Sequence, residues 1–186
     1  MFHIAEALTR WITPILSFTA EEINEALPGQ RPDSVLLNTW YDGLYALPAE
    51  SDLSRDYWNR LIEVKDAVNK CLEDARNEKL VKGSLGAEAI LYVSDELKVD
   101  LERLGEELRF VLLTSEVTLK PLAEGTDART TDLASLKVSV QASEKVKCAR
   151  CWHHREDVGS HAAHPSLCGR CITNLPEGEG ESRSYS

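Results

Sequence analysis

The chain has 186 residues, of which 42% are hydrophobic and 28% charged, and its formal net charge is −10 at pH 7. This length allows one ordinary domain or two to three small ones. No stretch approaches the roughly 20 apolar residues that a transmembrane helix needs, and the first residues lack the basic leader and apolar run of a secretory signal. We therefore expect a cytoplasmic protein with no membrane partner.

An acidic chain argues at first against a nucleic-acid partner. The charge is uneven, however. Residues 1–144 carry 15 Lys or Arg against 26 Asp or Glu, whereas residues 145–175 carry five Lys or Arg against two Asp or Glu. The basic part of the chain is therefore local.

The residue pattern of the opening segment predicts helices. Its apolar residues follow a helical stripe: Ile4, Leu8, Trp11, Ile12, Ile15 and Leu16. Thr13 followed by Pro14 predicts an N-cap with proline at the first helical position. Thr19 and Glu22 have the spacing of a capping box, and the Leu-Pro-Gly sequence at 27–29 should end the element.

The strongest helical pattern follows a loop over residues 30–50 and runs from Asp52 to about Lys79. Its apolar residues recur at steps of three and four: Leu53, Tyr57, Leu61, Val64, Val68, Leu72 and Ala75. At ~1.5 Å per residue, this helix would span about 40 Å. We expect it to pack against the first segment, so that residues 1–80 form a partial α-helical bundle.

The character of the chain changes after residue 80. The expected strands are Glu88–Val93, Leu108–Leu113, Val117–Leu119 and Leu136–Val140. Ser94 should cap a helix from Asp95 to about Leu104. The predicted fold class is therefore α+β in several parts. These are the partial bundle (1–80), a small mixed α+β connecting unit (81–143), a four-cysteine zinc knuckle or ribbon (144–175) and a flexible tail (176–186).

Four of the five cysteines form two C-x-x-C pairs with sixteen residues between them: Cys148, Cys151, Cys168 and Cys171. This spacing is typical of a structural zinc site, in which four thiolates lie about 2.3 Å from one Zn²⁺. Two disulfides are the alternative, which a cytosolic chain disfavours, and a redox motif would need only one pair. Four thiolates leave no open metal position, which excludes a zinc hydrolase. Cys71, alone on the long helix, should serve packing.

Aromatic and basic residues crowd the same segment and are candidate RNA contacts. The candidates are Lys147, Arg150, Trp152, His153, Arg155 and Arg170. Aromatic rings stack on unpaired bases, and guanidinium groups suit phosphate. In the alternative interpretation, Trp152 forms the small core of the module, which its size favours, while the histidines are exposed and the arginines are merely solvated.

Several stretches carry a resemblance to a known family. Lys147–His154 (KCARCWHH), Asp157–Gly159 (DVG) and Cys168–Leu175 (CGRCITNL) resemble the C-terminal zinc module of bacterial isoleucyl-tRNA synthetases. Residues 5–8, 11, 14–23 and 27–29 are similar to the last part of that family's helical anticodon-binding domain, and 83–85 and 108–115 to its connecting region. Two positions depart from the family pattern. Asn24 stands where a tryptophan is frequent, and Gly86 where an acidic residue is usual.

The resemblance implies a tRNA-binding, anticodon-side region of an enzyme that attaches isoleucine to its tRNA with ATP. The implied partners are isoleucine tRNA and the remainder of the same synthetase chain, in a monomer. One structural Zn²⁺ is implied, whereas ATP and Mg²⁺ belong to a catalytic domain whose H-I-G-H and K-M-S-K-S signatures this sequence lacks. The chain alone should therefore be inactive. The alternative is a structural or protein-docking zinc module without RNA contact, which the acidic remainder favours.

Overall fold

A computed structural model describes residues 1–48, 51 and 53–184, which divide into two compact units, Met1–Ser54 and Arg55–Ser186. Asp52, where the sequence pattern of the long helix begins, and Tyr185 and Ser186 of the predicted tail lie outside the described residues. Within the described ranges, none of the helices combines the length and the apolar character that crossing a membrane requires.

The first unit consists of α1 (Phe2–Ile12) and α2 (Ser17–Ala26), followed by a short 3₁₀ helix at Val35–Leu37. The predicted caps at Thr13 and Thr19 are wrong. Thr13 continues the helical backbone of α1, and its hydroxyl donates to the Thr9 carbonyl, 2.7 Å away. Thr19 lies inside the first turn of α2, which begins without a side-chain cap. The predicted end at residues 27–29 is confirmed, because Leu27 is extended.

Polar contacts hold the first unit together. Glu6 is buried and pairs with both Arg10 and Arg31. Arg31 also donates to the side chain of Asn24, at 3.3 Å, and Asn24 is itself 3% exposed. The residue that departs from the family's tryptophan thus lies inside this network. Many apolar side chains of the unit remain exposed, including Phe18 on α2.

The second unit is built on a four-stranded sheet in the order β2-β1-β4-β3. Its strands are β1 (Ala87–Val93), β2 (Glu116–Pro121), β3 (Arg129–Thr130) and β4 (Leu136–Ala142). β1 pairs in parallel with β2 and antiparallel with β4. Every second residue of β1 is fully buried, as expected for a strand whose alternate side chains face the core. The strands predicted at Glu88–Val93, Val117–Leu119 and Leu136–Val140 are confirmed as β1, β2 and β4.

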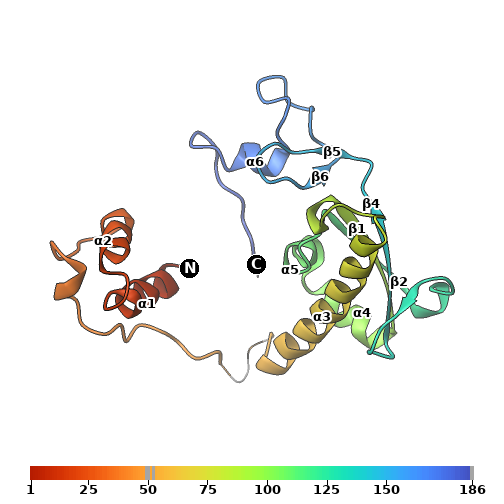
Figure 1. Ribbon diagram of the computed structural model, residues 1–186, viewed down its shortest axis with the longest axis horizontal. Helices are drawn as coiled ribbons and strands as arrows, with labels where there is room; N and C mark the ends of the chain where they lie inside the picture. Colours follow the sequence, from red (N-terminus) through yellow and green to blue (C-terminus); the bar gives the residue numbers. More distant parts are fainter. Residues whose placement is uncertain (49–50, 52, 185–186) are drawn as a thin grey trace. The chain divides into compact units, whose positions relative to one another are not determined.

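The long helix α3 (Arg55–Asn77) packs on this sheet, against β4 (Figure 1). Its predicted apolar stripe is buried, and so is Cys71, as expected of a packing thiol. The sheet therefore covers the apolar face of α3 that was expected to pack against the first segment, and for this face the expectation is wrong. A periodic stripe shows which face is buried and does not identify the element that covers it.

The connection between β1 and β2 is helical. Ser94 caps α4 (Asp95–Glu102) by accepting from the Leu97 amide, as predicted. The strand predicted at Leu108–Leu113 is wrong, because this segment forms α5 (Leu108–Val111) and a turn in which Leu113 has a φ of 56°. Leu108 and Leu112 are both buried, which is a helical spacing of four. A short apolar run does not distinguish a buried strand from a buried helix.

The remaining elements, β5 (Val146–Lys147), β6 (His154–Arg155) and α6 (Gly169–Thr173), follow the sheet and form a small module around the cysteines. Helices, a mixed sheet and a four-cysteine module together confirm the predicted α+β class. The boundaries 1–80, 81–143, 144–175 and 176–186 stay predictions, as does the mobility of the tail. The amides of Gly178, Gly180 and Glu181 donate to the end of α6 and the two residues after it, and the Ser184 amide donates to Glu107.

Candidate metal centre and nucleic-acid interface

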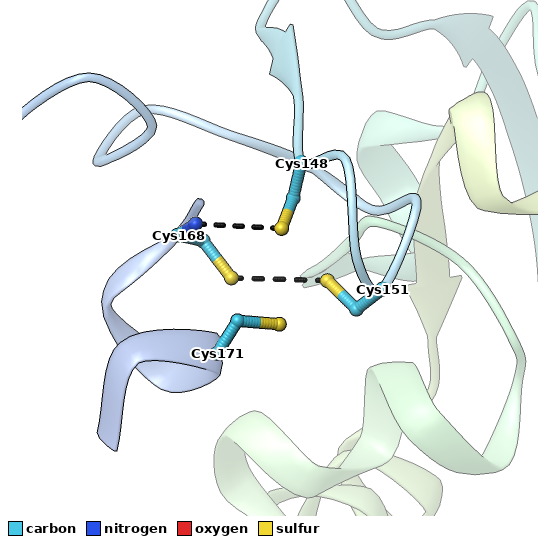
Figure 2. Close-up of side chains that lie close together, drawn as sticks. All are labelled: Cys148, Cys151, Cys168 and Cys171. Carbon is cyan, nitrogen blue, oxygen red and sulfur yellow. Dashed lines mark hydrogen bonds between the residues drawn. The ribbon is translucent and has the colours of Figure 1, made fainter. Parts of the chain in front are cut away.

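Two local structures bring the four cysteines together. β5 and β6 form an antiparallel hairpin whose tight turn carries Cys148 and Cys151. Cys168 precedes the first turn of α6, and Cys171 lies within that helix. Figure 2 shows the four sulfur atoms pointing toward one another from these two sides. Each C-x-x-C pair is therefore held by backbone geometry before any metal is considered.

The distances fit a tetrahedral metal site. All four sulfur atoms lie within 4.8 Å of one another, and the Sγ atoms of Cys151 and Cys168 are 3.7 Å apart. Four sulfurs at about 2.3 Å from one Zn²⁺ would be separated by about 3.8 Å along each edge of a tetrahedron. Among the described residues, all five cysteines are free of disulfides. The four-cysteine cluster thus fits a closed structural zinc site.

The environments of the thiols differ. Burial raises the pKa of Cys148, but backbone N–H groups, first of Cys151 and Cys168, lower it more strongly, to about 6. Burial raises the pKa of Cys171, and the neighbouring thiols raise it further. The fold therefore favours the thiolate form of Cys148, while the repulsion between neighbouring thiolates disfavours ionisation of the others. A divalent cation is the charge that stabilises all four thiolates.

The interior of the module consists mainly of cysteine. Cys148, Cys168 and Cys171 are buried, and only Cys151, Val158 and Leu167 pack against them as partly buried hydrophobic residues. The prediction that Trp152 forms this core is wrong, since its side chain is 59% exposed. The tight turn requires a left-handed backbone at Trp152, with a φ of 66°.

A shallow groove runs beside the exposed tryptophan. It has a volume of about 460 Å³ and is lined by Lys82, Gly83, Ser84, Leu85, Gly86, Lys147, Trp152 and His154. The Lys147 ammonium lies 5.2 Å from the centre of the Trp152 ring. A Cβ at Gly86 would lie 3.6 Å from His154 Nε2, which is an ordinary contact. The departure at Gly86 is therefore not a steric requirement.

The two histidines after Trp152 attach the module to the sheet domain. His153 is 7% exposed, and its Nδ1 accepts a hydrogen bond from Arg109 Nη1 at 3.0 Å. Burial and then Arg109 lower the pKa of His153 to about 4, which keeps it neutral at pH 7. The His154 amide donates to the buried hydroxyl of Ser115, at 2.6 Å. The alternative that the histidines are exposed holds for His161 but not for His153.

The three arginines named from the sequence are already engaged within the protein. Arg150 donates to the carbonyls of Cys171 and Asn174, at 2.8 and 2.9 Å, at the end of α6. Arg155 donates to the Ser115 carbonyl at 3.4 Å. Arg170 pairs with Glu181 at 2.8 Å. These contacts leave other N–H groups of each guanidinium available.

Several residues of this region come from other segments and are not predictable from the sequence pattern of the module. Arg109 belongs to the segment predicted as a strand, Ser115 follows that segment, and Lys82 precedes β1. No spacing pattern marks them, because they meet the module only through the fold. The Gly83-Ser84-Leu85 stretch is marked in the sequence only by its family resemblance.

Two family models match the chain. Residues 147–174 match a model described as a zinc finger found in FPG and IleRS, and residues 1–91 match a model described as the anticodon-binding domain of tRNA ligase. Among curated proteins, the chain is 58% identical over 187 residues to an isoleucine–tRNA ligase of Alcanivorax borkumensis. It is 59% identical to one of Pseudomonas aeruginosa and 54% identical to one of Marinomonas. Each alignment covers 100% of this chain and 20% of the relative, so the chain spans about a fifth of the length of these proteins.

Proposed function

We propose that this chain is the anticodon-side, tRNA-binding C-terminal region of an isoleucine–tRNA ligase, because its whole length is similar to curated ligases of that name and two family models match parts of it. The parent enzyme would attach isoleucine to its tRNA with ATP and Mg²⁺ in the cytoplasm, as a monomer. The partners of this region would be isoleucine tRNA and the remainder of the synthetase chain. On this proposal, contacts made far from the reacting groups contribute binding energy that positions the tRNA.

The exposed aromatic and cationic face of the zinc module is the observation that carries this proposal. Trp152 is a large aromatic residue that the fold leaves exposed, with Lys147 beside its ring and Lys82 in the lining of the same groove. Stacking on an aromatic ring contributes about 1–3 kcal/mol per base, and lysines neutralise the adjacent phosphates. This groove therefore suits an unpaired base of an anticodon loop.

The other candidate contacts have different roles in this proposal. Arg150, Arg155 and Arg170 would use their remaining N–H groups on phosphate oxygens. His153 is buried against Arg109 and would act by holding the module in place. We therefore rank Lys147 and Trp152 first, the three arginines next and His153 last for direct contact.

A titration of the zinc-loaded 186-residue chain against isoleucine tRNA tests the proposal. The same tRNA with an altered anticodon is the comparison, at low and moderate salt. We expect weaker binding of the altered tRNA, and a loss of about tenfold for Trp152→Ala. Lys147→Gln should weaken binding and reduce its salt dependence. Lys98→Gln on α4 removes one charge outside the groove and serves as the matched control.

A structural role without RNA contact is the second candidate. The observation that favours it is the attachment of the module to the sheet domain through Ser115, Arg109 and His153. Under this alternative, Trp152→Ala would leave tRNA affinity unchanged. Equal affinity for both tRNAs at every salt concentration would exclude anticodon recognition by this region.

A further inference from the structure

A second cationic and aromatic cluster lies where α6 of the module and the segment after it meet α5. The guanidinium carbons of Arg109, Arg170 and Arg183 lie 4.0, 4.9 and 4.0 Å from the centre of the Phe110 ring. We call these four residues the arginine cluster. Its members come from α5, α6 and the segment that follows α6. The fold thus gathers three cations around one half-buried ring.

A carboxylate from the chain itself occupies this cluster. Glu181 accepts hydrogen bonds from the Nε atoms of Arg170 and Arg183, at 2.8 and 2.7 Å. Its backbone is held by Asn174, whose side-chain oxygen accepts from the Glu181 amide at 3.2 Å. Two guanidiniums that converge on one oxyanion form the arrangement that also binds phosphate. The segment that supplies Glu181 is rich in Gly, Glu and Ser and has few apolar anchors.

Arg109 is the most buried arginine of the cluster, and one of its nitrogen atoms lacks a hydrogen-bond acceptor. It is 8% exposed, and its Nε is the buried side-chain nitrogen that lacks a hydrogen-bond partner among the described residues. The nearest carboxylate, that of Glu106, is 3.6 Å away on a side chain that is 85% exposed. Burial lowers the pKa of Arg109, and Arg155 and Arg170 lower it further. A buried guanidinium in this state favours a further anion nearby.

We propose that the arginine cluster is a phosphate-binding site for RNA, and that Glu181 occupies it as an internal competitor. An RNA phosphate would replace the Glu181 carboxylate against Arg170 and Arg183, whose guanidiniums lie beside the Phe110 ring. The inference rests on the proposed tRNA-binding function and adds a second contact to it, on residues outside the Trp152 groove. It also assigns a role to the segment after α6, which lowers RNA affinity until it is displaced.

A simpler role for the arginines is to offset the charge of the metal centre. Four thiolates around one Zn²⁺ carry a net charge of −2, and Cys151 interacts electrostatically with both Arg109 and Arg170. Glu181 argues against this as their whole role. It adds negative charge to the same guanidiniums, which weakens any such compensation.

The two roles make different predictions for Glu181→Gln. If Glu181 competes with phosphate, the substitution should tighten tRNA binding by the zinc-loaded 186-residue chain about fivefold. Glu179→Gln is the matched control, because Glu179 is an exposed residue of the same segment and its substitution removes the same charge. The control should change affinity less than twofold. If the arginines only offset the thiolates, both variants should bind alike, and Glu181→Gln should change zinc retention alone.

A second arm identifies the site. In the Glu181→Gln background, Arg183→Gln should reverse the gain and reduce the slope of log affinity against log salt by about 0.7. Phe110→Leu keeps an apolar side chain but removes the ring beside which the guanidiniums lie, and it should also lose part of the gain. Zinc content measured on each variant shows that the module is intact.

Two results would overturn the inference. Equal affinities of the Glu181→Gln and Glu179→Gln variants, with tRNA binding by the parent chain intact, would remove the internal competitor and leave the proposed function standing. No tRNA binding by the parent chain or by Glu181→Gln would remove both. Binding that appears only in Glu181→Gln would support the competitor directly.

Discussion

Removal of zinc should unfold the cysteine module and leave the sheet domain intact. The hydrophobic side chains that support the module, apart from its cysteines, are Val158 and Leu167, and both are only partly buried. Even full burial would contribute about 1.5–3 kcal/mol for each. Structural Zn²⁺ contributes an apparent free energy of about 10–16 kcal/mol in small zinc modules. The metal therefore dominates the stability of this segment.

Hydrogen exchange can follow this loss segment by segment. In the folded module the Cys148 amide donates to the His153 carbonyl at 2.9 Å, and the Ala149 amide to the Ser166 carbonyl at 3.0 Å. After chelation, peptides from residues 147–174 should lose protection completely. Peptides from β1 and β4 should keep theirs, because that sheet is stabilised by buried residues such as Leu91 and Val138.

Two substitutions sharpen the experiment. Cys168→Ser should reproduce the effect of chelation without any chelator, since it removes one of the four thiolates. Cys71→Ser is the control, because Cys71 is a buried thiol on α3 outside the cluster. Full protection of residues 147–174 in the metal-free chain would refute the reasoning, since the module would then be stable through its own packing.

Two further predictions concern the stability of each compact unit. Glu6→Gln should destabilise the first unit by about 2–3 kcal/mol, because it leaves Arg31 and a second arginine without their buried partner. Burial raises the pKa of Glu6, but the two arginines lower it below 4.5 overall. The parent chain should therefore lose this contribution as the pH falls from about 4.5 through the lower pKa, and the variant should not. Hydrogen exchange of α1 peptides against pH measures both. Leu91→Ala, at a fully buried position of β1, should lower the free energy of unfolding of the second unit by about 2–5 kcal/mol in urea, against less than about 0.5 for Ile62→Ala, which is 53% exposed. An unchanged urea midpoint for Leu91→Ala would mean that β1 is not central to that core.

The metal centre was predictable from the sequence because its ligands lie close together along the chain. Two C-x-x-C pairs need only one linker that doubles back, and their spacing identifies all four ligands. The caps were less predictable. Ser94 has a helix directly after it, with two acidic residues in the first turn, and caps that helix as expected. Thr13 has a helix on both sides, and the preceding one uses its hydroxyl.

The surroundings of the metal centre could not be predicted in the same way. Trp152 is large and apolar, so its size suggested burial, but the tight turn of the cysteine pair determines the direction of its side chain. His153 looked like a surface residue among polar neighbours, and it is buried because Arg109 meets it from α5. Contacts of this kind depend on where distant segments pack, which short-range patterns do not contain.

The positions of the cations matter more for RNA binding than the charge balance of the segment. A zinc site with four thiolates reduces the positive balance of residues 145–175 by two charges, so the module cannot bind RNA through net charge alone. What distinguishes it is where the cations lie. Lys147 and Lys82 border the exposed Trp152, and arginines surround Phe110. Local placement of cations beside aromatic rings favours unpaired RNA, while the acidic remainder of the chain opposes non-specific binding of double helices. On the proposed function, the negative charge of the chain would raise selectivity for unpaired RNA while lowering the general affinity for nucleic acids.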